Sequence, residues 1–406
     1  MPFHAYGPSV DDEVLLDAVR RGDDRPQEPG EPFWRMPYLF LRAALYCGGR
    51  LTPATVDGVR YLVRTIREPA FGGDDPSMRP AVLWFLRDVA AAALDGLDRA
   101  AASRRDAPEV REWLAAYLRT PRSVFDWDES DAPGEVLLAA ARADCFDLLP
   151  EVFAAVEHLL TAASSRLRIS AAAATAMLSR HPDLTAHRPR LLAHQLAECT
   201  SVDPYHRASM LLSAGELGGA PREWLHDPDP AVRVCAALAP ALADDPESTT
   251  VLLTEATRNP AAIDMRAFEG MMALSSLPHA AATLAEQLCR RVHDTDRLLA
   301  PALASIPYGT TYVDIGGKSR AEATLSEPYL RSFFPYGLPP PSTATPGQRR
   351  LAGAVAAHDP PWESGFPSLP PRDRHAASRT ARAWRATFAR LGLPVDRASW
   401  RTLGQR

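Results

Sequence analysis

One phrase of the sequence, DPDPAVRVCAALA at 227–239, limits the possible folds of this chain more than any other feature. Asp229 can cap the start of a helix, because its carboxylate accepts the free backbone N–H groups of the first turn. Pro230 suits the first helical position, where no N–H partner exists. The phrase therefore predicts a helix, bent at Pro240, and a second helix follows at 247–258. Apolar residues at helical spacing form one face of the first helix, namely Val232, Cys235, Leu238 or Ala239, and Leu242.

The same unit recurs along the sequence. Arg233 of the phrase has a counterpart at Arg266, 33 positions later (266 − 233), and another at Arg168, 65 positions earlier (233 − 168). A copy with looser spacing begins near Tyr205. A period in the low thirties with two helices per unit is typical of helical arrays, in which no hairpin buries its apolar face alone. We therefore predict an all-α fold in which helical hairpins stack as an α-solenoid.

Two stretches interrupt this helical pattern. The segment 306–327 contains the β-prone, glycine-bearing sequence YGTTYVDIGGKSR, and 335–346 is rich in proline. We accordingly divide the chain into a repeat solenoid at 1–305, an irregular insertion at 306–346 and a C-terminal helical cap at 347–406. The other predicted helices span 34–47, 52–67, 77–97, 107–120, 134–143, 151–163, 347–358, 372–391 and 395–403.

Composition and cysteine spacing argue against several classes of protein. With 46% hydrophobic and 23% charged residues, the 406-residue chain resembles an ordinary globular protein. Its apolar runs are shorter than the roughly 20 residues of a membrane span, and its N-terminus lacks the pattern of a secretion signal. The five cysteines form no C-x-x-C pair. We expect a cytoplasmic protein without a cofactor.

Charge is distributed unevenly along the chain. The formal net charge is −5, and residues 1–31 carry three arginines and eight acids, giving 3 − 8 = −5. Residues 372–406 carry nine arginines and two acids, giving 9 − 2 = +7. Such a basic end is a candidate partner-binding surface, with Arg379, Arg382 and Arg385 as its binding residues. The alternative is that these arginines simply solvate an exposed helix face.

Several stretches of the chain resemble a known family. The phrase DPDPAVRVCAALA is similar to the HEAT-like repeats of phycobilisome lyases. The stretches FHAYGPSVDD, ALYCGGRLTPATVDGVRYLVRTI, TPGQRRLAGAVAAHD and LGLPVDRASW resemble actinobacterial HEAT-repeat proteins. The chain departs from that pattern where Cys47, Gly48 and Gly49 replace the usual His-Gln-Gly, so no role of those polar residues carries over. The resemblance implies an α-solenoid of HEAT-like hairpins in the cytoplasm, and it implies little about activity.

Aromatic residues beside carboxylates provide one set of candidate binding residues. Trp84 and Asp88 lie one helical turn apart, and Trp127 adjoins Asp128 in an acidic loop. A tryptophan with a carboxylate suits a cationic ligand, through the ring quadrupole and the charge together. HEAT-like DNA glycosylases hold damaged bases with such residues. The alternative is that each tryptophan belongs to the hydrophobic core.

Lys318 is the weak catalytic candidate. It is the only lysine among 45 lysines and arginines, so arginine supplies the other 44 positive charges. A lysine can lose its proton when desolvated and can then act as a base, which arginine cannot. Asp314 and Tyr312 are candidate polar partners in the same glycine-bearing loop. An exposed lysine in a surface loop is the alternative, and Tyr312 replaces the leading glycine of a phosphate-binding loop.

No metal site is predicted. His181, His187 and His194 are close in sequence, but Pro182 and Pro189 interrupt their helical spacing. This interruption argues against a ligand set on one helix face.

Three functions are compatible with these observations. The first is a non-catalytic HEAT-repeat scaffold or regulatory protein, such as a toxin-neutralising one, that binds a macromolecule and most simply another protein. The second is an enzyme of specialised metabolism that acts on a small molecule in the solenoid groove near 306–327. The third is a HEAT-like DNA glycosylase or lesion-binding protein, which the net negative charge disfavours. We expect neither a nucleic-acid partner nor a membrane.

Overall fold

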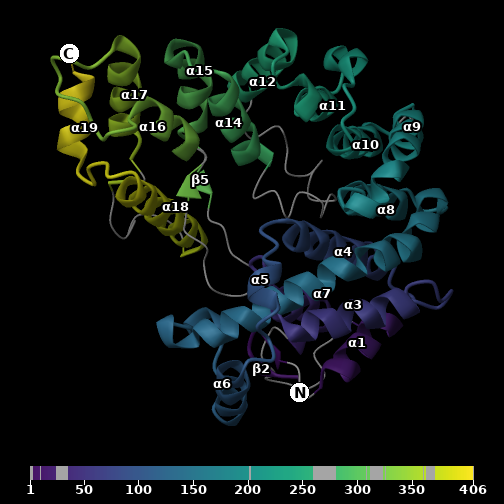
Figure 1. Cartoon of the computed structure of the whole chain (residues 1–406). Coiled ribbons are helices and arrows are strands. Elements are labelled where there is room, and N and C mark those ends of the chain that lie inside the picture. Colours follow the sequence, from purple (N-terminus) through teal and green to yellow (C-terminus); the bar gives the residue numbers. More distant parts are fainter. Residues whose placement is uncertain are drawn as a thin grey trace. The chain divides into compact units, whose positions relative to one another are not determined.

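The computed structural model shown in Figure 1 describes residues 3–9, 11–23, 35–200, 203–258, 280–307, 309–310, 323–324, 326–359, 361–362 and 371–405. The chain divides into two compact units, Met1–Ser201 (unit 1) and Val202–Arg406 (unit 2). The all-α prediction is confirmed, because helices form most of both units. The six strands of the described residues are each two residues long and pair as three separate hairpins.

Unit 1 is built around α4, Met78–Leu94, which packs against α7 and α8. Apolar residues surround this helix on all sides, so it is buried along most of its length. The other elements of unit 1 are β1 Phe3–His4, β2 Gly7–Pro8, α1 Asp12–Arg21, α2 Pro37–Leu39, the π-helix η2 Phe40–Leu45, β3 Tyr46–Cys47, β4 Arg50–Leu51, α3 Pro53–Thr65, α5 Arg99–Ala102, α6 Pro108–Arg119, η3 Val124–Asp126, η4 Glu129–Asp131, α7 Ala132–Val156, η5 Glu157–Thr161, α8 Ser165–Leu178, η6 Pro182–His187 and α9 Arg188–Glu198.

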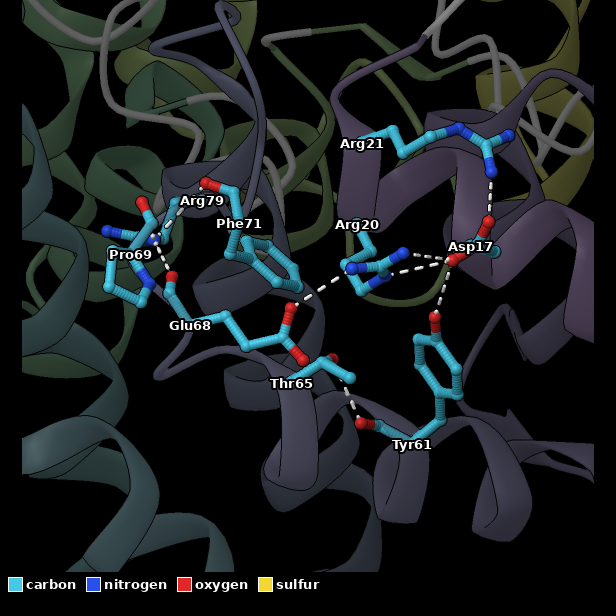
Figure 2. Close-up of polar contacts among 9 residues, drawn as sticks. All are labelled: Asp17, Arg20, Arg21, Tyr61, Thr65, Glu68, Pro69, Phe71 and Arg79. Carbon is cyan, nitrogen blue, oxygen red and sulfur yellow. Dashed lines mark hydrogen bonds and ion pairs between the residues drawn. The ribbon is translucent and has the colours of Figure 1, made fainter.

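Helix α1 is held against α3 by a polar network (Figure 2). Asp17 accepts hydrogen bonds from Arg20 Nε at 2.8 Å and from the Tyr61 hydroxyl at 3.2 Å. Arg20 Nη1 also donates to Glu68 at 3.1 Å. The side chains are partly exposed, and each acid has an arginine partner within the unit. The network therefore serves as an anchor for α1.

A close backbone approach fixes the end of α1. Gly22 ends the helix with a φ of 72°, and Gly72 N donates to Arg20 O at 2.7 Å. A Cβ atom on Gly22 would lie 1.9 Å from Gly72 O. Only glycine therefore fits at this contact.

In unit 2, helices that are close in the sequence pack against each other. Contacts join α10 to α11, α11 to α12, α12 to α14 and α15, and α17 to α19, which lie side by side in Figure 1. The elements are α10 Pro204–Glu216, η7 Arg222–His226, α11 Pro230–Ala237, η8 Pro240–Leu242, α12 Pro246–Arg258, α14 Ala280–Arg291, α15 Thr295–Ser305, β5 Gly309–Thr310, β6 Ala323–Thr324, α16 Glu327–Phe333, α17 Pro346–Ala357, α18 Pro371–Arg390 and α19 Arg397–Gly404.

The start of α11 follows the prediction, and its end does not. The Asp229 carboxylate accepts hydrogen bonds from Ala231 N at 2.8 Å and Val232 N at 3.2 Å, and Pro230 is the first helical residue. The helix stops at Ala237 and does not bend at Pro240. The cause is the restriction that a proline places on the preceding residue, which disfavours the α conformation there.

Arg168 and Arg233, which the repeat pattern places in equivalent positions, make the same set of contacts. Nη1 of Arg168 donates to Ala162 O at 2.9 Å and Ala163 O at 3.1 Å, and Nε donates to Glu198 at 3.0 Å. For Arg233, Nη1 donates to Asp227 O at 2.7 Å and Pro228 O at 2.9 Å, and Nε donates to Glu255 at 3.1 Å. In both cases the carbonyls belong to the loop five and six residues before the arginine. The third counterpart, Arg266, lies outside the described residues.

Three predicted helices differ from the observed elements. The predicted helices at 134–143 and 151–163 are mostly one helix, α7, which continues through Pro150 because Cys145 and Leu149 extend its buried face. The predicted helix at 34–47 is instead α2, the π-helix η2 and strand β3. A two-residue glycine turn with positive φ at both positions then joins β3 to β4.

Candidate functional site

A buried ionic cluster joins η2 to α4 in unit 1. The Asp88 side chain is 3% exposed, and its two oxygens face Arg42 Nη2 at 3.2 Å and Arg87 Nη1 at 3.4 Å. The Arg87 guanidinium carbon lies 5.8 Å from the centre of the Trp84 ring. Arg42 is on a π-helix, a feature often found at functional sites. The cluster is thus the most unusual electrostatic arrangement in unit 1.

Trp84 and Asp88, the predicted cation-binding pair, lie together within this cluster. Both are buried, and arginines of the same unit already contact the ring and the carboxylate. A positively charged ligand would have to displace a guanidinium group from Asp88. In the described part of the chain, arginines of unit 1 therefore already take the positions that a cationic ligand would occupy.

The second predicted pair lies at the edge of an aromatic cluster. The Trp127 ring centre is 5.1 Å from that of Trp113, 5.8 Å from that of Tyr117 and 5.9 Å from that of Phe3. Trp127 is partly buried, whereas Asp128 is exposed. The Asp128 carboxylate accepts hydrogen bonds from the hydroxyl and the backbone N–H of Ser130, and these bonds lower its pKa. Trp127 is thus largely a core residue and Asp128 a turn-capping residue.

Asp131 is the carboxylate that this loop buries, and sequence reasoning missed it. Arg122 Nη2 donates to both of its oxygens at 2.6 Å, and Trp113 Nε1 donates to one of them at 3.2 Å. Burial raises the pKa of nearby Tyr117 to about 12, so its hydroxyl stays protonated at neutral pH. The acidic loop therefore satisfies its most buried charge from within.

The other predicted site residues are only partly described. Arg382 and Arg385 are exposed on α18, one turn apart. Arg379 belongs to the same helix, and its side chain lies outside the described residues, as do Lys318, Asp314 and Tyr312 altogether. In the described part of the chain, no group of three or more histidine, cysteine, aspartate or glutamate residues is arranged to hold a metal ion.

Two exposed apolar side chains in unit 2 were not predicted as site residues. Tyr336 is 99% exposed and Val395 is 59% exposed. They occupy two turns that touch, since a Cβ built on Gly337 would lie 3.6 Å from Gly392 O. We call this surface the two-turn patch, formed by Tyr336, Val395 and their turns 334–338 and 391–396. Its only sequence signal is the proline-rich phrase FFPYGLPPP around Tyr336.

The buried Trp400 supports both turns of the patch. Its ring meets Phe334 edge-on at 5.6 Å, and its Nε1 donates to Pro394 O at 2.9 Å. The first turn closes through Gly337 N, which donates to Phe334 O at 3.3 Å. In the second turn, Leu393 N donates to Phe388 O at 2.8 Å. This hydrogen bond ends α18 in a Schellman-type turn. The two exposed side chains are therefore held on a fixed support.

Comparison with known proteins identifies no relative, because no family model, curated protein or solved structure matches the chain. None of the helices in the described residues has the length and apolar character needed to cross a membrane.

Proposed function

We propose that this is a non-catalytic, macromolecule-binding protein, a HEAT-like α-solenoid that acts as a scaffold or regulator by binding another protein. The observation that carries the proposal is the two-turn patch. The third exposed large hydrophobic side chain of the described residues, Val14, stands by itself on α1, and single exposed apolar residues are ordinary. Tyr336 and Val395 instead lie on touching turns, and we take this pair of exposed apolar side chains as the centre of an interaction site.

The energetic argument rests on preorganisation. Burying one large apolar side chain against a partner is worth about 1.5–3 kcal/mol, which corresponds to roughly 10- to 100-fold in affinity. A flexible loop loses part of this gain when it becomes ordered on binding. Trp400 holds both turns, so little ordering cost remains for Tyr336 and Val395. Rigid tyrosines of this kind are frequent hot spots of protein interfaces.

The glycosylase alternative fits the described residues less well. A carboxylate that stabilises a damaged base must reach that base, and Asp88 is buried between two guanidinium groups. The small-molecule enzyme alternative rests on Lys318 and its neighbours, which lie outside the described residues. The protein-binding proposal rests instead on Tyr336 and Val395, whose surroundings belong to the described residues.

The test begins with the protein that copurifies with the chain in its native cells. That protein is produced separately and titrated against the purified chain by isothermal titration calorimetry. Tyr336→Ser should weaken binding about 10- to 100-fold and Val395→Ser about 3- to 10-fold, because each removes buried apolar surface. Val14→Ser is the matched control and should bind like the wild type.

Far-UV circular dichroism should be unchanged in all three variants, since none of these side chains is packed in the core. If no copurifying protein binds in the reconstituted titration, or if Tyr336→Ser binds with wild-type affinity, the proposal is wrong. Release of a bound metabolite in native mass spectrometry, without any protein partner, would favour the enzyme alternative.

A further inference from the structure

We infer that the two-turn patch selects an acidic protein segment, in which an apolar side chain is flanked by aspartate or glutamate. This inference rests on the proposed protein-binding function and adds the chemistry of the partner. It follows from the net charge of the two segments that carry the patch and from the way in which their carboxylates are bound.

The two segments that carry the patch are strongly basic. The segments 326–359 and 381–405 contain eight arginines and three acids, giving 8 − 3 = +5. The arginines are Arg331, Arg349, Arg350, Arg382, Arg385, Arg390, Arg397 and Arg401. A surface with this charge attracts acidic partners and accelerates their association.

The three acids of these segments are all engaged. The Asp359 carboxylate accepts a hydrogen bond from Arg397 Nη2 at 2.7 Å. Asp396 caps α19 by accepting from Ser399 N at 2.8 Å. The third, Glu327, is buried and is shared by two arginines. The acids are too few to neutralise the arginines, so the positive net charge of the two segments remains to attract an incoming acidic chain.

The two arginines that bind Glu327 each precede one residue of the patch in the sequence. Arg331 lies on α16, five residues before Tyr336, and Arg390 ends α18, five residues before Val395. Arg331 Nη2 contacts one oxygen of Glu327 at 3.1 Å, and Arg390 Nη2 contacts the other. The Arg331 side chain is 64% exposed. Arg331 therefore keeps a largely exposed guanidinium group on the same segment as Tyr336, and a carboxylate of the partner can pair with it.

A single-stranded nucleic acid is the other acidic polymer to consider, since a base can stack on a tyrosine. The patch favours a protein because its second anchor, Val395, is aliphatic and offers no stacking surface. Turns that contain proline and expose an apolar side chain also suit a complementary pocket on a protein. Binding of nucleic acid is therefore treated as an outcome that overturns the inference.

The experiment selects peptides from a random twelve-residue library displayed on phage, with the full chain as the target. Counter-selection uses the double variant Tyr336→Ser/Val395→Ser, which removes peptides that bind elsewhere. We expect the enriched peptides to carry net negative charge and at least one large apolar residue. Synthetic copies should bind more weakly as the salt concentration rises.

A matched pair of arginine variants tests the charge contribution. Arg331→Gln should weaken binding of the selected peptides about 3- to 10-fold. Arg290→Gln should have no effect, although Arg290 is equally exposed in unit 2 and also pairs with a glutamate four residues earlier. Equal effects of the two variants would mean that general surface charge, and not the patch, determines binding.

The possible failures are distinguishable. Enrichment of neutral or basic peptides would overturn the acidic selectivity and leave protein binding at the patch intact. No enrichment over the double variant would contradict the proposed function itself. A single-stranded twenty-nucleotide DNA that displaces the selected peptides and binds more tightly than they do would overturn the choice of a protein partner.

Discussion

Replacement of Arg233 by methionine tests whether its contacts stabilise the α11–α12 hairpin. Nη1 of Arg233 donates to Asp227 O at 2.7 Å and to Pro228 O at 2.9 Å. Nε and Nη2 both donate to Glu255 Oε1, at 3.1 and 2.6 Å. One side chain therefore joins the loop before α11 to the last turn of α12. Methionine keeps most of the apolar stem and removes the charge and every donor.

The expected loss is large because the partner is buried. The Glu255 side chain is 10% exposed and that of Arg233 is 20% exposed. Removing one member of a buried ion pair costs about 3–5 kcal/mol, because the other charge remains without a partner. Each hydrogen bond to a charged group contributes about 1.5–3 kcal/mol, but the contributions of the ion pair and of its hydrogen bonds cannot simply be summed. The residual exposure of both side chains places the expected loss near 3 kcal/mol.

Urea unfolding followed by far-UV circular dichroism measures this loss. Arg290→Met is the control, because Arg290 and Glu286 form an exposed pair at 3.8 Å whose removal should cost less than about 0.5 kcal/mol. In the double variant Arg233→Met/Glu255→Met no buried carboxylate is left without a partner, so part of the stability should return. A loss below about 1 kcal/mol for Arg233→Met would refute the reasoning.

Two further variants address unit 1. In Gly134→Ala the new methyl group would lie 2.6–2.8 Å from the rings of Trp113 and Trp127, so overpacking should cost about 1–3 kcal/mol and change the near-UV circular dichroism spectrum. His4 tests pH dependence, since burial and then the charge of Arg35 lower its pKa from 6.5 to about 4. The unfolded chain binds a proton at higher pH than the folded chain does, so stability should fall by up to about 3 kcal/mol as the pH decreases from 6.5 to 4. His4→Gln should lack this component in urea titrations across that range, and an unchanged pH profile would contradict the assignment.

The fold was predictable where its signals are local. Asp229 and Pro230 specify the start of α11 within four residues, because a helix cap depends only on adjacent backbone groups. Continuation of α7 through Pro150 was not predictable in the same way. The cost of an internal proline is offset by the burial of apolar residues on both sides of it, and that burial depends on α3, α4 and α8, which lie elsewhere in the sequence.

The candidate sites were less predictable for a related reason. Spacing alone places Trp84 and Asp88 on neighbouring turns, but it cannot show that Arg42, 46 positions before Asp88 (88 − 42), contacts the carboxylate. The sequence also does not show that Tyr336 is exposed. A tyrosine after Phe334 and Pro335 could face the core, and only the packing of Phe334 on the distant Trp400 shows that Tyr336 faces solvent.

The chain's preference for arginine has a structural consequence that lysine could not reproduce. Arg168 and Arg233 each bind two carbonyl oxygens and a carboxylate with one guanidinium group, and Arg291 binds Ala237 O at 2.9 Å and Ser248 Oγ at 2.9 Å. A planar group with five donors can bridge a loop and a helix at once, whereas an ammonium group has three donors around a single nitrogen atom. The charges of Arg168 and Arg233 are matched, because each binds a glutamate, whereas the hydrogen bonds of Arg291 go to neutral oxygens. The positive net charge of the segments that carry Tyr336 and Val395 comes instead from arginines that outnumber the acids there, which is why charge selectivity is expected at the two-turn patch.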